Sequence, residues 1–155
     1  MPSVITTDSL TYTFISNDGQ TLFSNNYPLP LVNISFLIVG DNNGTGSPYF
    51  QGISITKVMD INTSGFLKSL FSHDTNMENE NIVIEIKVYK KRDSTPYFSY
   101  KLTNIKIGDY SLGSETNSIG QYEYISLFSK IYGYKDYVTN KSIGFNVSQN
   151  RIVPY

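Results

Sequence analysis

Apolar and polar residues alternate along several short stretches of the chain, which is the pattern expected of β-strands that bury one face. The clearest stretch is 82–89, where every second residue from Ile82 to Val88 is apolar while Glu85 and Lys87 lie on the opposite face. Weaker alternation predicts strands at 10–15, 31–39, 53–59 and 97–107, then one long strand or a strand pair at 122–134, and a last strand region at 137–153. We therefore expect about seven to nine short strands.

One stretch has helical rather than strand spacing. Its four apolar residues fall on a single stripe of a helix of about two to three turns, and they are Phe66, Leu67, Leu70 and Phe71. Thr63 or Ser64 is suited to accept a hydrogen bond from the first free N–H groups of this helix. We expect the apolar stripe to cover an open end or edge of the sheet.

The predicted strand at 97–107 changes phase along its length. Its apolar residues are even-numbered up to Leu102 and odd-numbered from Ile105 to Ile107. A shift of one residue within a strand is what a β-bulge produces. We therefore predict a bulge near Thr103-Asn104.

Turn-forming residues separate the predicted strands. Asp18-Gly19 supplies a turn, and Pro28 and Pro30 exclude both a helix and a central strand at that point. The most loop-like segment is 40–48, which is rich in Gly and Asn. This spacing of strands and turns predicts a mainly β fold, an antiparallel β-barrel or sandwich with one short α-helix. With 155 residues and no linker or internal repeat, we expect a single domain over 1–155.

The composition favours self-association over nucleic-acid binding. Hydrophobic residues make up 39% of the chain and charged residues only 16%, and 12 Lys and Arg against 13 Asp and Glu give a net charge of −1. A surface this weakly charged shows no electrostatic footprint for nucleic acid. It suits a protein that packs against copies of itself.

Targeting signals are not evident in the sequence. The stretch 1–8 has neither the basic nor the apolar region of a Sec-type signal peptide. The apolar runs are far shorter than the roughly 20 residues that a membrane helix needs. We therefore expect neither a cleaved signal peptide nor membrane insertion.

Candidate catalytic and metal-binding residues are few. The chain has no cysteine, which excludes disulfides and thiolate chemistry, and its one histidine, His73, follows the predicted helix beside Asp74 as a cation near a helix C-terminus. The run beginning at Asp41 resembles a calcium loop only faintly, because it lacks the final bidentate glutamate. We predict no catalytic, cofactor or metal site, and we expect the 13 tyrosines to lie mainly in the core and at interfaces.

The order of several motifs resembles the haemolysin-coregulated protein (Hcp) family, the tube subunit of the bacterial type VI secretion system. The motifs are Ile55-Thr-Lys-Val-Met-Asp60, the helix start Thr63-Ser64, Ile84-Glu-Ile-Lys-Val-Tyr89, Tyr97-Phe98 with Leu102 and Ile105, and Glu123-Tyr-Ile-Ser-Leu127 followed by Lys130-Ile131. The resemblance covers roughly the last two-thirds of the chain. No single motif is a catalytic signature.

The resemblance implies a non-enzymatic structural subunit that forms hexameric rings, stacks them into a tube and is expelled with effector cargo. Its partners would be copies of itself, sheath, spike and baseplate proteins and effectors, first in the bacterial cytoplasm and then in the extracellular space or a target cell. It also implies a ring-stacking loop, which here comprises Asp41, Asn42, Asn43, Gly44, Thr45, Gly46, Ser47, Pro48 and Tyr49. Two alternatives remain open, a tail-tube protein of a phage-like contractile particle and a monomeric β-sandwich that binds a glycan or a protein.

Overall fold

The computed structural model describes residues 10–16, 25, 27–40, 48–71, 83–90, 93–114 and 121–155. Its elements are β1 (Leu10–Ser16), β2 (Leu29–Leu31), β3 (Asn33–Val39), β4 (Tyr49–Val58), α1 (Thr63–Phe71), β5 (Val83–Lys90), β6 (Phe98–Gly113), β7 (Tyr122–Asp136), β8 (Lys141–Asn146) and β9 (Arg151–Val153). The nine strands form one sheet in which every pair is antiparallel. The predicted mainly β fold with one short helix is confirmed.

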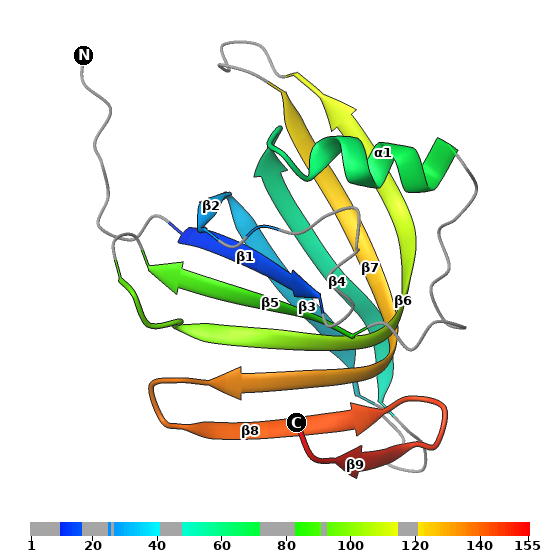
Figure 1. Cartoon of the computed structure of the whole chain (residues 1–155). Helices are drawn as coiled ribbons and strands as arrows, with labels where there is room; N and C mark the ends of the chain where they lie inside the picture. Colours follow the sequence, from blue (N-terminus) through cyan, green and yellow to red (C-terminus); the bar gives the residue numbers. More distant parts are fainter. Residues whose placement is uncertain are drawn as a thin grey trace.

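The sheet curls into a barrel because its two end strands are consecutive in the chain. The strand order is β2-β1-β5-β6-β7-β4-β3, and only Val32 separates β2 from β3. The chain therefore pairs with β1 before Val32 and with β4 after it, and the Val32 N–H donates to the Thr56 carbonyl at 2.9 Å. Beyond the barrel, β8 pairs with β7, and β9 pairs with β8 (Figure 1).

Several strands extend beyond their predicted bounds. Residues 53–58 of the predicted 53–59 belong to the longer β4, residues 98–107 of the predicted 97–107 are the first part of β6, and 122–134 lies in one continuous strand, β7. The region 137–153 contains two strands, β8 and β9, joined by a turn at 147–150. Pro30 lies in β2, which pairs with β1 alone, as expected for a proline in a strand.

β6 and β7 are long and bent, so each takes part in two walls of the barrel (Figure 1). β6 pairs with β5 only up to Thr103, and β7 pairs with β4 up to Leu127 and with β8 from Ile131. At this corner Asn104 adopts a positive φ of 58°. The Ser129 hydroxyl lies 2.7 Å from the carbonyl oxygens of both Thr103 and Ile131, which holds the two bent strands together.

The predicted bulge at this corner is wrong, although the phase change is real. Thr103 pairs with Ile131 and Ile105 with Ser129, so the register is the same on both sides of Asn104. The set of residues in β7 that faces the barrel interior also changes phase at this corner, opposite the change in β6. The two changes compensate each other and leave the pairing register the same. The register shift between the two strands lies further on, between Ile107 and Tyr110.

The core fills the barrel with the inward-facing residues of the alternating strands. Its members are Tyr12, Phe14, Leu31, Ile53, Ile55, Phe66, Ile84, Ile86, Val88, Tyr100, Leu102, Ile105, Ile107, Ile125, Leu127 and Tyr132. The even-numbered face of β5 is buried as the sequence predicted. Burial of these side chains is the main favourable contribution to folding.

Helix α1 covers one end of the barrel, as its apolar stripe predicted (Figure 1). Phe66 is fully buried, and its ring centroid lies 6.0 Å from that of Phe14 and 6.1 Å from that of Tyr110.

The predicted capping role of Thr63 is wrong, because its hydroxyl accepts a hydrogen bond from the Asp60 N–H at 2.9 Å and donates one to Glu123. α1 has nine residues and is the only helix in the described ranges, and it is neither long nor apolar enough to span a membrane.

We predict that Gly52→Ala destabilises the barrel by about 1–3 kcal/mol. Gly52 lies in a bulge of β4 with a φ of +85°, and an added Cβ would come within 2.6 Å of the Leu127 carbonyl oxygen. The control is Gly113→Ala in β6, where an added Cβ meets nothing within 4 Å. Denaturant unfolding monitored by circular dichroism measures both variants, and equal stabilities for the two would contradict the prediction.

Candidate functional site: a buried polar cluster and an apolar groove

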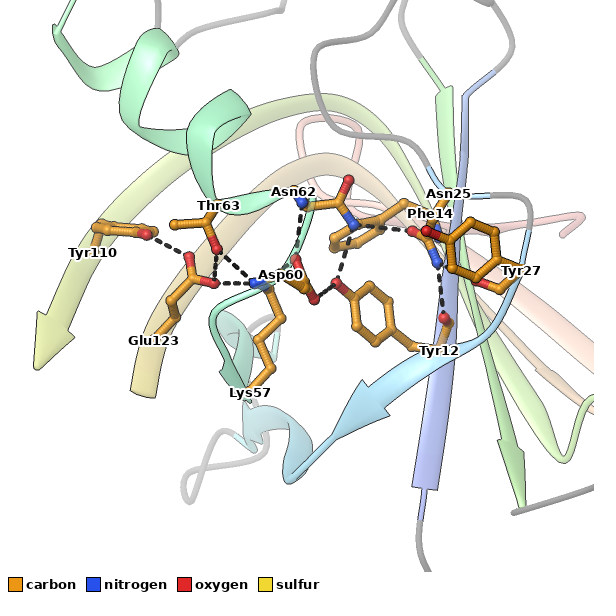
Figure 2. Close-up of polar contacts among 10 residues, drawn as sticks. All are labelled: Tyr12, Phe14, Asn25, Tyr27, Lys57, Asp60, Asn62, Thr63, Tyr110 and Glu123. Atoms are coloured by element: carbon orange, nitrogen blue, oxygen red, sulfur yellow. Dashed lines mark hydrogen bonds and ion pairs between the residues drawn. The ribbon is translucent and has the colours of Figure 1, made fainter. Parts of the chain in front are cut away.

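A buried lysine lies at the end of β4, where the chain turns toward α1. Lys57 follows Ile53 and Ile55 in the inward-facing row of the strand, and its side chain has no exposed surface. A charged ammonium in the core requires partners of opposite charge. Its Nζ lies 2.8 Å from Asp60 Oδ1 and also contacts Glu123 Oε1 (Figure 2).

Both carboxylates accept further hydrogen bonds from neutral donors. Glu123, on β7, accepts from the Thr63 hydroxyl at 2.5 Å and from the Tyr110 hydroxyl. Asp60 accepts from the Tyr12 hydroxyl at 2.5 Å. One ammonium faces two carboxylates, so these hydroxyl donors help to offset the remaining negative charge.

The cluster extends to β1 through two buried amides. The Asn62 side chain donates to the Tyr12 hydroxyl and to Asn25 Oδ1, both at 3.0 Å. Asn25 in turn donates to the Tyr12 carbonyl at 3.0 Å and accepts from the Phe14 N–H at 3.0 Å (Figure 2). We call Tyr12, Asn25, Lys57, Asp60, Asn62, Thr63, Tyr110 and Glu123 the buried polar cluster.

The environment of the cluster keeps its tyrosines protonated. Burial, followed by the hydrogen bond to Asp60, raises the pKa of Tyr12 well above its usual range. Burial and the hydrogen bond to Glu123 raise the pKa of Tyr110 in the same way. Both hydroxyls therefore stay donors at neutral pH, and the cluster serves to join β1, β4, β6, β7 and the start of α1.

The chemistry of the cluster is structural rather than catalytic. Lys57 and Glu123 are fully buried, and their charges are engaged with each other and with Asp60, Thr63 and Tyr110. In the part of the chain that the structure describes, no three His, Cys, Asp or Glu residues gather where they could hold a metal ion. His73 and Asp41 lie outside the described residues.

An apolar groove opens at the other end of β4, between the start of that strand and β8. It has a volume of about 620 Å³, which is within the range of ligand-binding pockets. Its walls are formed by Phe36, Ile38, Pro48, Phe50, Tyr100, Tyr132, Gly133, Tyr134, Ile143, Gly144, Phe145 and Ile152, and we call these residues the apolar groove. None of them carries a charge at neutral pH.

Aromatic rings pack against one another along the floor of the groove. The Tyr132 ring stacks on Phe36 and Phe50, with centroids 5.0 and 5.4 Å apart, and Phe50 lies 5.0 Å from Phe145. Burial raises the pKa of Tyr100 to about 12, so this residue is neutral too. The interlocked rings give the groove a shape that is present before any partner binds.

The rim of the groove exposes large apolar side chains. Ile143 is 50% and Ile152 69% exposed, and Ile38 lies on the opposite rim with 45% exposure. Leu37 and Val39, which neighbour Ile38 in β3, are also exposed but do not line the groove. Exposed apolar side chains around an apolar groove are typical of an interaction site.

Most of the predicted stacking loop lies outside the described residues. This applies to 41–47, whereas Pro48 lies in the groove wall and Tyr49 is 66% exposed at the start of β4. Sequence reasoning missed the groove and the cluster. The available signal was Lys57, a charged residue in phase with Ile53 and Ile55.

Comparison with known proteins identifies a matching family and solved structures of similar fold. The family described as "Type VI secretion system effector, Hcp" matches residues 36–145. No curated protein matches the chain by sequence.

Solved structures of similar fold include Hcp1 from Salmonella typhimurium, which is 11% identical with a TM-score of 0.67 over 94% of this chain and 99% of that one. A mutant of Hcp1 from E. coli EAEC 042 is 16% identical with a TM-score of 0.68 over 89% and 98%. The secreted protein Hcp3 from Pseudomonas aeruginosa is 13% identical with a TM-score of 0.61 over 89% and 97%. At these identities the structures establish a shared fold.

We predict that Lys57→Met lowers the free energy of unfolding by about 3–5 kcal/mol, because it leaves Asp60 and Glu123 buried without a cation. The control is Lys106→Met, at an exposed lysine of β6, with an expected change within about 0.5 kcal/mol. Adding Glu123→Gln to Lys57→Met removes one of the two carboxylate charges and should restore part of the loss. Denaturant unfolding measures all three, and a Lys57→Met variant as stable as the control would refute this role of the cluster.

We also predict a loss of stability above pH 10 that depends on Tyr12. Its pKa is raised in the folded state from an ordinary value of 10.0, so the stabilisation is complete below that pH and declines as the unfolded state releases its proton above it. Tyr12→Phe should be less stable at pH 8 but should lose less stability between pH 9 and 11. Unfolding curves across that interval test this, and equal slopes for the two proteins would count against it.

Proposed function

Because this chain belongs to the Hcp family of the type VI secretion system, we propose that it is a structural subunit of the inner tube of that system. Copies of the chain form hexameric rings, the rings stack head to tail, and the tube is expelled by a contractile sheath. The observation that carries the proposal is the family match over 36–145, which runs from β3 into β8.

The open edges of the sheet support assembly from copies of one chain. Along Asn33–Val39, β3 pairs with β4 alone, and β9 pairs with β8 alone. Strands at an edge present unpaired N–H and C=O groups that can extend a sheet into a neighbouring molecule. A contact between two different surfaces of the same subunit closes into a ring when its rotation permits, and stacking repeats it along an axis.

The motif residues that link this chain to the family also support a structural role. Lys57, Asp60, Thr63 and Glu123 all belong to the buried polar cluster, where their polar groups bond to one another. Buried residues with satisfied hydrogen bonds stabilise a fold and do not contact a substrate. The most recognisable part of the sequence thus maintains the barrel from which a tube is built.

On this proposal the subunit has several partners and two locations. It contacts copies of itself, the sheath, the spike, the baseplate and effector proteins carried by the tube. It resides in the bacterial cytoplasm before firing and reaches the extracellular space or a target cell afterwards.

The loop 41–49 is our candidate for the contacts between stacked rings. Its sequence is rich in Gly and Asn, it connects β3 to β4, and its residue Pro48 lines the apolar groove. Tyr49 is exposed at the point where the loop enters β4, and its ring would be available to a neighbouring subunit.

We predict that deletion of Asn42–Gly46 leaves the fold intact and abolishes ring stacking. Light scattering followed by negative-stain imaging should find a mass near six chains with annular particles for the unchanged protein, and separate rings without tubes for the deletion. Val138→Ala, in the exposed β7–β8 turn, should assemble normally as a control.

Normal tubes from the deletion variant would remove the loop from the stacking contact. A native protein that stays monomeric at every concentration would favour a β-sandwich that binds a glycan or a protein.

A further inference from the structure

A second hollow lies on the face of β7 and β8 opposite the apolar groove, and it differs from the groove in charge. Ile131 lines the hollow, whereas the next residue, Tyr132, lines the groove. The hollow has a volume of about 350 Å³, at the lower end of the range for small-molecule sites. Its only charged lining residues in the described ranges are Lys101 on β6 and Arg151 on β9, and we therefore call it the cationic hollow.

Neither cation of the hollow forms an ion pair with a carboxylate in the part of the chain that the structure describes. Glu85 lies directly opposite Lys101 on β5, but it accepts a hydrogen bond from the Tyr155 hydroxyl. Its other oxygen lies 3.6 Å from Lys87 Nζ. Lys101 Nζ lies instead 5.1 Å from the centre of the Tyr155 ring. An anion in the hollow would be attracted by both Lys101 and Arg151.

A buried amide adds a hydrogen-bond donor to the lining of the hollow. Asn146 is 8% exposed and lies opposite Arg151 in the pairing of β8 with β9. Its Oδ1 accepts from the Ser148 hydroxyl at 2.9 Å and from the Gln149 N–H at 3.1 Å. A backbone N–H can only donate, which fixes the orientation of the amide. Its Nδ2 is left without an acceptor among the described residues, so it can donate to a ligand.

The wall of the hollow that follows β9 is held in place. Gly133 on β7 and Gly144 on β8 are paired side by side, and the chain after β9 crosses over both. A Cβ at Gly144 would come within 2.7 Å of the Pro154 carbonyl oxygen, and one at Gly133 within 2.9 Å of the Tyr155 ring. The Tyr155 hydroxyl is hydrogen-bonded to side chains of β5 and β6. A site with ordered walls loses little conformational entropy on binding.

We propose that the cationic hollow binds a small organic dicarboxylate. Its two cations come from strands that are three apart in the sheet, a separation of roughly 14 Å between backbones, so each can meet one carboxylate of a single ligand. Arg151 can hold a carboxylate through two parallel hydrogen bonds, and Asn146 Nδ2 lies beside it as a further donor.

The uncharged part of the lining fits the remainder of such a ligand. Ile131 and Val153 contribute apolar surface between the two cations, which suits a short hydrocarbon linker. Inorganic phosphate carries its charge on one centre and cannot meet both cations. The hollow is formed by a single chain, so the inference goes beyond the proposed function and does not depend on self-assembly.

Calorimetric titration with succinate, glutarate and adipate tests the site, and we expect at least one of them to bind with one ligand per chain. The uncharged diamide of the tightest binder should not bind. Inorganic phosphate should bind at least about tenfold more weakly. In the isotope-labelled protein, the side-chain amide signal of Asn146 should shift in proportion to saturation.

Asn146→Asp separates binding from folding. Aspartate keeps an oxygen that can accept from Ser148 and Gln149, but it replaces the amide donor with a negative charge. The fold should therefore persist while the dicarboxylate affinity falls about tenfold or more. The matched control is Asn33→Asp, which adds the same charge at an exposed position of β3 outside the hollow and should leave the affinity unchanged.

A pair of lysine variants tests the cation in the same way. Lys101→Met should weaken binding about tenfold or more, whereas Lys106→Met, at an exposed position of the same strand outside the hollow, should not.

Four results would overturn the inference. They are the absence of binding by all three dicarboxylates, equal affinity in the unchanged protein and Asn146→Asp, phosphate affinity equal to that of the dicarboxylates, and binding of a tetraglutamate peptide alone. The last result would indicate a docking surface for an acidic protein. None of them affects the tube subunit proposal, because particle mass and imaging test that proposal separately.

Discussion

The charge of Lys57 is the constraint on which the arrangement of the barrel depends. An ammonium without solvent exposure must be matched by carboxylates, and these come from the turn after β4 and from β7. Each carboxylate then recruits hydroxyl donors, Tyr12 from β1 and Tyr110 from β6. One buried charge thus links four strands and the start of α1. We infer that this linkage contributes to the uniqueness of the fold as well as to its stability.

Local patterns predicted the elements well and the connections between distant elements poorly. The alternation in β5 and the apolar stripe of α1 are local signals, and both were correct. Thr63 or Ser64 was expected to cap the helix because residues of this type favour that position, yet the Thr63 hydroxyl donates its hydrogen bond to Glu123, 60 residues away in the chain. The bulge was misplaced because the phase change in β6 is matched by one in β7, which no pattern within β6 reveals. The phase of Lys57 with Ile53 and Ile55 indicates burial, but the local sequence does not reveal its partner Glu123 on β7.

The residues that identify the family differ from the residues that form the apolar groove. Among the motifs that resemble the Hcp family, Lys57, Asp60 and Glu123 lie inside the barrel, where their charges pair with one another. The groove consists of uncharged, mainly apolar residues brought together from β3, β4, β6, β7, β8 and β9 and from Pro48. No sequence pattern marks such a surface, because its members are neighbours only in the folded chain.

The pairing of β4 with β7 also sets an order of events during synthesis. Ile53 lies opposite Leu127, and the chain leaves the ribosome from its N-terminus, so β4 emerges long before the strand that covers its edge. Pairings between such distant segments form slowly. Throughout that interval the apolar residues of β3 and β4 are accessible to any other nascent copy. For a chain that assembles as proposed, closure of the barrel before copies meet would bury these residues and so favour ordered assembly over aggregation.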